Sequence, residues 1–410
     1  RVLRIFMAEL FKEHLSLIKI NTLGQSIAQQ ASNYAEAFDK KAFNEQLHIF
    51  ALEALASDNK KTTRVEQDNI QYQPCIEDVW QSLSLMQRLR TAAKALYQVM
   101  PEVKGADIVV ETLKYNDELS GWLSLICCEY IGIHQYLSIE QGLYYLQQIT
   151  EYFSAEFAIR HFILREPEQT LAILKTWLTH ENHHVRRLIS EGTRPRLPWG
   201  VRLPLFIEQP QLVLPLLFAL RDDSEEYVRR SVANHLNDIA KDHPQLVIDT
   251  AKQWLLSEEL NALSAQQKQC RIKLVRHACR TLFKQGQPEI MALFGYQPAD
   301  DVHCRLSSQQ YKIPFSGEFE FEMILEKTQE TENQLMIDYV MHFQKANGKQ
   351  AAKVFKWLNR HLESSSKESV IKKHSFRKIS TRKYYPGMHK IEIMVNGIKK
   401  SQIEFELMAP

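Results

Sequence analysis

The sequence predicts an α-solenoid of HEAT-like helical repeats followed by a small all-β immunoglobulin-like sandwich. Three observations predict this fold class. Apolar residues recur at helical spacing as far as about residue 300, a short motif repeats within that region, and two-residue alternation begins after Asp300. The chain has 410 residues, more than one hydrophobic core ordinarily serves. We therefore expect a helical domain over residues 1–300 and a sandwich over residues 301–410.

The repeat is a valine followed by two basic residues. Val185–Arg187 recurs as Val228–Arg230 after 43 residues, and a weaker copy, Val275–His277, follows after 47 more. Each copy lies on a predicted helix that follows an apolar helix. Helix pairs at intervals of 40 to 47 residues are typical of HEAT-like units. Such pairs must stack on their neighbours to bury their apolar faces, so the repeat predicts a solenoid with a concave inner surface.

The other predicted elements follow from local patterns. Residues 8–56 and the stretch from Ile76 to Phe294 have helical spacing, whereas residues 57–73 are polar and read as a loop. In the last hundred residues, alternating segments predict about seven short strands. The pairs Asn347-Gly348 and Asn396-Gly397 are typical of tight hairpin turns.

Composition excludes several classes of protein. The 51 basic residues nearly balance the 49 acidic ones, so any nucleic-acid surface must come from local clustering. The six cysteines are sparse and form no Cys-x-x-Cys pair, which favours a reducing bacterial cytoplasm and gives no disulfide framework or zinc site. No apolar run approaches the roughly 20 residues of a membrane helix, so we expect no membrane partner.

The least ordinary segment runs from Val185 to Gly200. A helix is expected to end at Glu191-Gly192, and two prolines then stiffen a loop that carries Arg194, Arg196 and Trp199. Such a loop holds its side chains in fixed directions and loses little entropy on binding. The alternative is a plain helix end with an ion pair between Arg187 and Glu191, one turn apart.

Two other segments place carboxylates among apolar residues. Glu156 and Arg160 lie one helical turn apart, as do Asn234 and Asp238. Burial would strengthen the electrostatic effect of these acids. The ordinary alternatives are an i, i+4 salt bridge in the first case and hydrogen bonds to the loop backbone in the second.

Basic residues cluster in the predicted sandwich. No acidic residue occurs between Ser369 and Ile391, and Tyr384 and Tyr385 follow the basic run. The run contains Lys372, Lys373, Arg377, Lys378, Arg382, Lys383 and Lys390. A solvated face and a DNA-contacting face are both compatible with this pattern. His180, His183 and His184 lie in a turn with no completing ligand set, so we expect no metal there, and we assign Cys127 and Cys128 to the core.

These segments, with the stretch from Lys273 to Gly286, resemble the AlkC branch of the HEAT-like DNA alkylation-repair glycosylases, and the stretch from His374 to His389 resembles the immunoglobulin-like domain that many members carry. The most diagnostic run is Ser-Glu-Gly-Thr-Arg-Pro-Arg-Leu-Pro-Trp, residues 190–199. The resemblance implies catalytic carboxylates at Glu156 and Glu191, with Trp199 beside the lesion. It also implies that Arg187 supports the site or the DNA backbone, and that Asp238 is a further acid of the pocket.

The implied activity is excision of cationic N3-methylated bases, namely 3-methyladenine and 3-methylcytosine, from double-stranded DNA by a monomeric, monofunctional enzyme without metal or cofactor. Carboxylates suit this reaction because the sugar becomes oxocarbenium-like as the neutral base departs. An indole face attracts the cationic base. Phosphate contacts are expected from Arg186, Arg187, Arg194, Arg196, Arg229, Arg230, Arg276, Lys378, Arg382 and Lys383. Two alternatives remain open: a non-catalytic HEAT scaffold that binds nucleic acid or protein, and a glycosylase for bulky or N7-alkylated bases.

Overall fold

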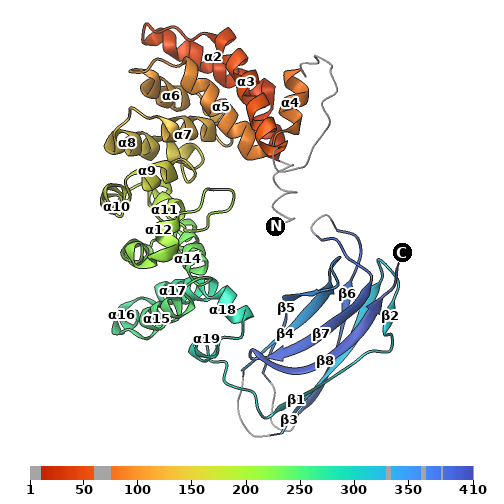
Figure 1. Ribbon diagram of the computed structural model, residues 1–410. Helices are drawn as coiled ribbons and strands as arrows, with labels where there is room; N and C mark the ends of the chain where they lie inside the picture. Colours follow the sequence, from red (N-terminus) through yellow and green to blue (C-terminus); the bar gives the residue numbers. More distant parts are fainter. Residues whose placement is uncertain (1–10, 60–74, 329–333, 362–365, 380–381, 410) are drawn as a thin grey trace. The chain divides into compact units, whose positions relative to one another are not determined.

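A computed structural model describes residues 11–59, 75–328, 334–361, 366–379 and 382–409 (Figure 1). Helices extend from Lys12 to Leu293 and strands from Val302 to Leu407, as the change in sequence pattern predicts. The segment expected to be a loop, residues 57–73, lies outside the described residues from position 60 onward. The helices are η1 (Lys12–Leu15), α2 (Leu17–Asn33), α3 (Lys40–Asn59), α4 (Ile76–Ser82), α5 (Leu85–Val99), α6 (Gly105–Lys114), η2 (Asp117–Leu119), α7 (Ser124–Ile133), α8 (Ile139–Ile149), η3 (Thr150–Tyr152), α9 (Ile159–Arg165), α10 (Pro167–Thr176), α11 (His183–Gly192), α12 (Pro204–Glu208), η4 (Pro210–Leu212), α13 (Leu214–Leu220), α14 (Glu226–Ile239), α15 (Pro244–Leu256), α16 (Glu258–Ala262), α17 (Ala265–Ala278), α18 (Arg280–Lys284) and α19 (Pro288–Leu293).

The chain forms two compact units, and the division falls between Asp242 and His243. The first unit contains the helices up to α14. The second contains α15 to α19 together with the sandwich. The division into compact units therefore falls inside the helical region, ahead of the change from helix to strand.

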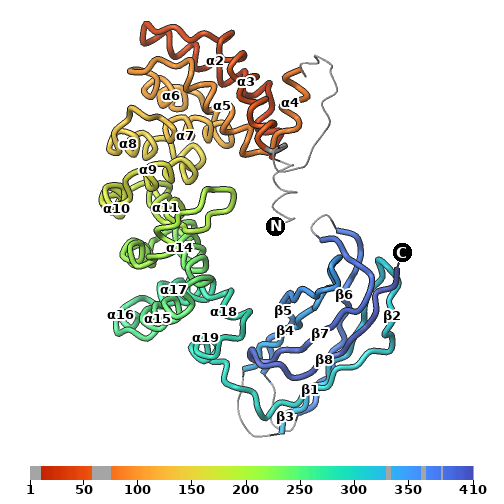
Figure 2. The backbone as a smooth tube through the Cα atoms, viewed as in Figure 1, coloured from red at the N-terminus to blue at the C-terminus, as the bar shows by residue number. Residues whose placement is uncertain are grey.

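Helices of the first unit stack in successive layers, with α5 packed on α3 and α7, and α11 packed on α14 (Figure 2). The repeat valines Val185 and Val228 are almost completely buried at this packing. Cys127 and Cys128 are buried in α7, as expected of core residues. Burial of the apolar stripe on each helix is the main force that holds such an array together.

The first arginine of each repeat motif stabilises the turn before its own helix. Arg186 Nη1 donates hydrogen bonds to the carbonyl oxygens of His180 and Glu181, at 2.7 and 2.9 Å. Arg229 Nη1 binds the equivalent carbonyls, those of Asp223 and Ser224. Arg186 also pairs with Asp223 in two hydrogen bonds, so it links neighbouring repeats. The three guanidinium nitrogens of Arg186 are thus committed to the fold, which argues against a phosphate contact there, whereas Arg229 uses Nη1 for its turn and its expected phosphate contact stays a prediction.

The described residues of the second unit form eight strands in two sheets. The orders are β1-β3-β6 and β2-β8-β7-β4-β5. Almost all neighbouring strands are antiparallel, and the short β2 runs parallel to β8. The strands are β1 (Val302–Ser307), β2 (Lys312–Ile313), β3 (Glu318–Lys327), β4 (Gln334–Gln344), β5 (Gln350–His361), β6 (Lys367–Ser375), β7 (Gly387–Val395) and β8 (Ile398–Leu407).

The sandwich core consists of inward-facing aromatic and aliphatic side chains from both sheets. Residues of β3 alternate between buried and exposed positions, as the two-residue sequence pattern requires. Phe319 and Phe405 stack across the core with ring centroids 3.8 Å apart. Gly348 lies in the turn between β4 and β5, and Asn396 and Gly397, both with positive φ, form the turn between β7 and β8. The predicted hairpin turns are thus confirmed.

The β7–β8 turn packs on the helical part of the same unit. A Cβ atom built on Gly286 would lie 2.5 Å from the carbonyl oxygen of Gly397, so the two backbones touch. Asn396 Nδ2 also donates a hydrogen bond to the carbonyl of Gln297, and Lys400 Nζ to that of Ala299. These contacts explain why the last helices cluster with the sandwich.

Candidate active site

The predicted acids lie in the first unit: Glu156 just before α9, Glu191 on α11 and Asp238 on α14. Glu156 precedes α9 in a turn and does not lie on a helix with Arg160. The ordinary alternative, an i, i+4 salt bridge between these two residues on one helix, is therefore wrong. Instead, Glu156 Oε2 lies 2.5 Å from Arg187 Nη1 on α11, and Ser154 Oγ donates to the same oxygen at 3.0 Å.

Arg187 joins the two predicted carboxylates. Its Nη2 lies 3.6 Å from Glu191 Oε1, while its Nη1 binds both Glu156 and Ser154 Oγ. The guanidinium carbon is 4.9 Å from the ring centroid of Tyr227 on α14. Burial acts to lower the pKa of Arg187, but the two carboxylates outweigh it and the pKa is raised. Arg187 thus stays charged and holds the acids at fixed positions.

Glu191 is fully satisfied within the protein. Its Oε1 accepts from Arg194 Nη1 at 2.6 Å, and its Oε2 accepts from Ser231 Oγ at 2.7 Å. Burial acts to raise the pKa of this carboxyl, yet Arg187, Arg194 and the serine hydroxyl together hold it below the ordinary value. Glu191 is therefore a buried carboxyl whose charged form is favoured by its partners.

The two acids differ in their freedom to meet a ligand. The side chain of Glu156 is 15% exposed, against 7% for Glu191 and 2% for Asp238. Glu156 Oε1 has no hydrogen-bond or ion-pair partner among the described residues, whereas both oxygens of Glu191 are occupied. Glu156 is the one member of this group with an uncommitted carboxylate oxygen near solvent.

Asp238 and Arg194 extend the network inward. Arg194 Nε and Nη2 bind Asp238 Oδ2 at 2.8 and 2.7 Å, and Lys241 Nζ lies 2.5 Å from Asp238 Oδ1. Glu156, Arg187, Glu191, Arg194 and Asp238 therefore alternate in charge. The expectation that Arg194 binds phosphate is wrong, because the guanidinium is buried between two acids.

Arg160 shapes the loop that follows α11. It donates from Nε to the carbonyl of Val201 at 2.7 Å, and from Nη1 to the carbonyls of Gly192 and Arg194 at 2.8 and 2.7 Å. Burial and the neighbouring Arg194 lower its pKa to about 10. The loop between Gly192 and Val201 is thus fixed from inside the protein, as the proline-rich sequence suggested.

Trp199 lies at the end of this loop in a left-handed backbone conformation, with φ of 67°. That conformation is disfavoured for a bulky L-residue and persists where the surroundings impose it. The indole is half-buried, and its ring centroid is 6.2 Å from that of Trp122.

Several contributors were not found from sequence. Ser154, Tyr227, Ser231 and Trp122 contact the predicted residues; Tyr227 and Ser231 share α14, whereas Ser154 and Trp122 lie in separate segments before α9 and α7. Ser231 directly follows the second repeat motif and Ser154 lies two residues before Glu156. Proximity to a singled-out residue was the one signal that the sequence offered for them.

The remaining predicted DNA-binding residues fall into two groups. Arg196 is bound by Asp242 in two hydrogen bonds of 2.8 Å. Arg276 donates to the Tyr296 hydroxyl and lies against three aromatic rings of the second unit, so it packs within that unit, and its expected phosphate contact stays a prediction. In contrast, Arg230 is exposed and forms no ion pair with the described residues.

The basic run of the sandwich is similarly divided. Lys373 and Lys390 pair with glutamates, and Arg382 lies 4.0 Å from the ring centroid of Phe343. Lys378 and Lys383 are exposed, and neither forms an ion pair with a described residue. With Arg377, which is also exposed and forms no ion pair with a described residue, these two lysines are accessible charges of the basic run.

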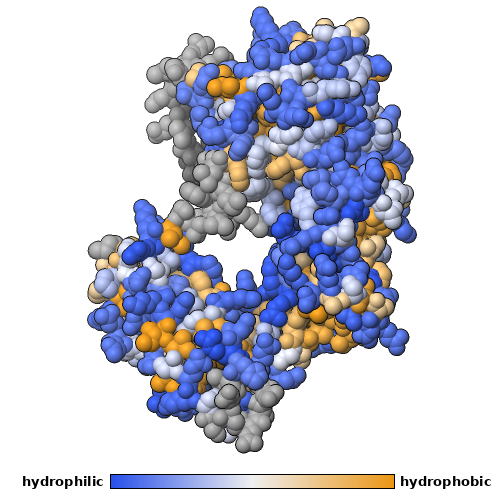
Figure 3. All heavy atoms as spheres, turned by 180° about the vertical axis from the view of Figure 1, so that it is seen from behind, coloured by the Kyte–Doolittle hydropathy of each residue, from blue (hydrophilic) through white to orange (hydrophobic). Residues whose placement is uncertain are grey.

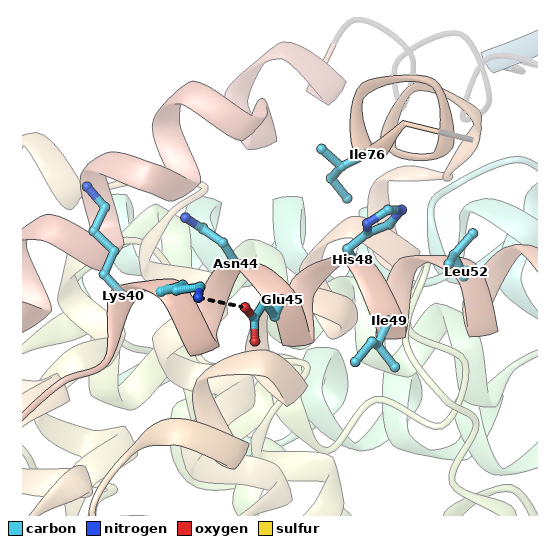
Figure 4. Close-up of a pocket in the computed structure, with 8 residues that line it drawn as sticks. Lys40, Asn44, Glu45, His48, Ile49, Leu52 and Ile76 are labelled. Carbon is cyan, nitrogen blue, oxygen red and sulfur yellow. Dashed lines mark ion pairs between the residues drawn. The ribbon is translucent and has the colours of Figure 1, made fainter. Parts of the chain in front are cut away.

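A separate open pocket lies against α3 and α4, far along the chain from the acid network (Figure 4). Its one ion pair among the drawn residues joins Lys41 and Glu45. Elsewhere, hydrophilic residues cover most of the face in Figure 3, and apolar residues form separate patches. In the described parts of the chain, no group of three or more His, Cys, Asp or Glu side chains is arranged to hold a metal, and no helix could span a bilayer.

The fold and site define a class: helical-repeat proteins with a C-terminal immunoglobulin-like sandwich and a buried network of alternating acids and arginines. Residues 302–409 match the family model described as "Uncharacterised protein YhaZ, C-terminal Ig-like domain". The protein YhaZ of Bacillus subtilis (strain 168) is 35% identical over 335 residues, which are 81% of this chain and 89% of YhaZ. The solved structure of the Pseudomonas fluorescens alkylpurine DNA glycosylase AlkC, bound to DNA containing an abasic site analog, is 31% identical with a TM-score of 0.80, over 97% of this chain and 99% of AlkC. The chain belongs to the family of AlkC and YhaZ.

Proposed function

We propose that this chain is a DNA glycosylase that removes cationic N3-methylated bases, 3-methyladenine and 3-methylcytosine, from double-stranded DNA and leaves an abasic site. The observation that carries the proposal is the uncommitted Oε1 of Glu156, beside a guanidinium that fixes its other oxygen. The similarity to AlkC over nearly the whole chain supports the same class of reaction.

The proposed reaction needs no general acid from the protein to protonate the departing base. Methylation gives the base a positive charge, so the base takes the electron pair of the C1′–N bond and departs neutral. The sugar becomes oxocarbenium-like, and Glu156 Oε1 stabilises that charge. A water molecule then attacks C1′ and transfers a proton to the same carboxylate. Because water is the nucleophile, the enzyme is monofunctional and does not cut the strand.

In this proposal Arg187, Glu191 and Asp238 do not contact the substrate but hold Glu156 in position. Glu191 holds Arg187 from one side, and Asp238 holds Arg194, which in turn binds Glu191. This support keeps Glu156 in place without a rearrangement during the reaction, which is the condition for electrostatic preorganisation. Glu191 and Asp238 are thus positioning residues, and Trp199 is placed beside the lesion.

The DNA partner is proposed to be held by the accessible cations. Arg230 belongs to the same helix, α14, as Ser231, whose hydroxyl binds Glu191. Lys378 and Lys383 would supply phosphate contacts from the sandwich, with the half-buried Arg382 as a further contributor. Such contacts fix the register of the duplex and do not read its sequence.

Release of free bases from methylated duplex DNA is the decisive experiment. The purified wild-type protein is expected to release 3-methyladenine and 3-methylcytosine, and Glu156→Gln to reduce single-turnover excision by more than tenfold, about 1.4 kcal/mol or more in barrier. The control variant Glu168→Gln removes an exposed carboxylate of α10 and should keep full activity.

Glu191→Gln should also reduce excision by more than tenfold, because Arg187 would lose one of its two anchors. Unchanged excision by Glu156→Gln would remove that residue from the chemistry. Release of only N7-alkylated bases would change the substrate assignment, and no release of any base would favour the DNA-binding scaffold.

A further inference from the structure

Tyrosine side chains gather along one row of helices in the first unit. Packing places α2, α6 and α8 in one row and α3, α5 and α7 in the next (Figure 1). Five of the chain's 15 tyrosines lie on the first row or in the segments that directly follow its helices. This group, which we call the tyrosine surface, consists of Tyr34, Tyr115, Tyr144, Tyr145 and Tyr152. None of the five belongs to the acid network.

Contacts between helices make these residues one continuous surface. The Tyr145 hydroxyl on α8 donates to Asp107 Oδ1 on α6 at 2.6 Å. The ring centroids of Tyr144 and Tyr145 are 5.9 Å apart. On α6, Lys114 Nζ donates to Glu111 Oε1 at 2.9 Å, and this lysine also interacts electrostatically with Tyr144. The tyrosines of α8 therefore lie beside the charged side chains of α6.

The charged groups around the tyrosine surface are mainly acidic. Burial is the largest cause that raises the pKa of the Tyr34 and Tyr152 hydroxyls, and nearby carboxylates raise it further. These carboxylates belong to Asp107, Glu111, Asp117 and Glu151. Lys114 opposes them and is itself paired with Glu111. Together these groups carry a net negative charge, which repels the phosphates of a nucleic acid and attracts a cationic ligand.

Two of the rings are open to solvent. Tyr115 is 77% exposed and Tyr144 is 59% exposed. Tyrosine is enriched in protein–protein interfaces because it offers a large ring and a hydroxyl at a low cost in side-chain entropy. Exposed tyrosines that are grouped among carboxylates are thus features of a surface for a cationic protein segment.

We propose that the tyrosine surface binds a partner protein through arginine side chains of that partner. A guanidinium stacks on a tyrosine ring and forms paired hydrogen bonds to a carboxylate, whereas the ammonium group of lysine is a point charge without that planar geometry. Tyr115 and Tyr144 supply the exposed rings, and Asp117 supplies an exposed carboxylate. The surface lies outside the acid network, so this inference goes beyond base excision and does not depend on it.

The test uses two labelled peptides of equal length and charge and the full-length protein without DNA. One peptide alternates arginine with glycine, and the other alternates lysine with glycine. Fluorescence anisotropy gives the dissociation constant of each. The wild-type protein is expected to bind the arginine peptide at least threefold more tightly, and equal affinity for the two peptides would overturn recognition of the guanidinium.

Removal of the exposed rings tests the surface itself. Tyr115→Ser/Tyr144→Ser should weaken binding of the arginine peptide by about 5- to 30-fold, the effect of two exposed cation–π contacts. Tyr115→Phe/Tyr144→Phe keeps both rings and should retain the affinity. The matched control Tyr311→Ser removes a ring of the sandwich that is 50% exposed and should change nothing. Wild-type affinity in the double serine variant would overturn the proposal, as would equal losses in the serine and phenylalanine variants.

The contribution of charge is tested separately. Asp117→Asn should weaken binding of both peptides, most clearly at low salt, and the control Glu258→Gln, at an exposed position of α16, should not. Base release by the double serine variant should equal that of the wild type, so failure of the proposed function leaves this test intact. Loss of DNA affinity in that variant, with unchanged peptide affinity, would identify a nucleic-acid contact and overturn the protein-binding surface.

Discussion

Arg187 Nη1 lies 2.5 Å from Glu156 Oε2, and this contact joins the turn before α9 to the middle of α11. The guanidinium occupies one carboxylate oxygen and leaves the other without a partner among the described residues. A carboxylate held in this way is oriented before any substrate arrives. Glu156 therefore keeps one oxygen available to a ligand, whereas the buried Glu191 helps to hold Arg187 in place.

Arg194→Met should destabilise the protein strongly. The change leaves Asp238 Oδ2 without its arginine and removes the shorter of the two arginine contacts of Glu191. Removing one partner of a buried ion pair costs about 3–5 kcal/mol, which urea denaturation would measure. Arg196→Met, which breaks the more exposed pair with Asp242, should cost about 0.2–1 kcal/mol. Similar losses in the two variants would refute a structural role specific to Arg194.

Arg229 and Arg230 are adjacent in sequence and should give opposite phenotypes. Arg230→Gln removes an exposed cation, so DNA affinity should fall and the salt dependence of log K should decrease by about 0.9. Arg229→Gln removes hydrogen bonds to two carbonyls of the preceding turn and should lower the free energy of unfolding by about 1–3 kcal/mol. Fluorescence anisotropy at several salt concentrations measures DNA affinity, and urea denaturation measures the free energy of unfolding. Loss of DNA affinity in both variants, without loss of stability in Arg229→Gln, would contradict the assignment.

The sandwich should contribute to DNA binding through its unpaired lysines. The double variant Lys378→Gln/Lys383→Gln should reduce the salt dependence of log K by about 2, because each phosphate contact releases roughly one counterion. Lys373→Gln is the matched control, since Lys373 already pairs with Glu320 at 3.0 Å. A salt dependence that is the same in the wild type, the double variant and the control would exclude these lysines from the interface.

The first unit should lose stability in mild acid because of His235. Burial lowers the pKa of this fully buried histidine to about 4, well below the 6.5 of an exposed histidine. Between these values the unfolded chain binds a proton that the folded unit does not, so stability decreases as pH falls from about 6.5 to 4, by about 1.4 kcal/mol per pH unit for this group. His235→Asn should reduce that slope, measured by hydrogen exchange of amides in α11 and α14. An unchanged slope would show that the imidazole protonates as easily in the folded unit as in the unfolded chain.

The sequence determined the architecture because architecture depends on local periodicity. Helical spacing, the valine-arginine repeat and the Asn-Gly turns each require only residues close in the chain, and the structure places helices, stacked repeats and hairpins accordingly. The same reasoning failed for Glu156. Spacing of four residues predicts contact with Arg160 only if a helix is continuous through both, and a turn intervenes there.

The tertiary structure alone decided which charged side chains are committed and which are free. From the sequence, the same role of phosphate contact is predicted for Arg186, Arg187, Arg194, Arg230 and Arg276. Folding brings acids, carbonyl groups and aromatic rings, several of them distant in sequence, against four of them and leaves Arg230 exposed. The physical reason is that electrostatic and hydrogen-bond partners are chosen by distance in space, and repeats that stack bring together residues 30 to 45 positions apart, as in the pairs Glu156–Arg187 and Arg194–Asp238.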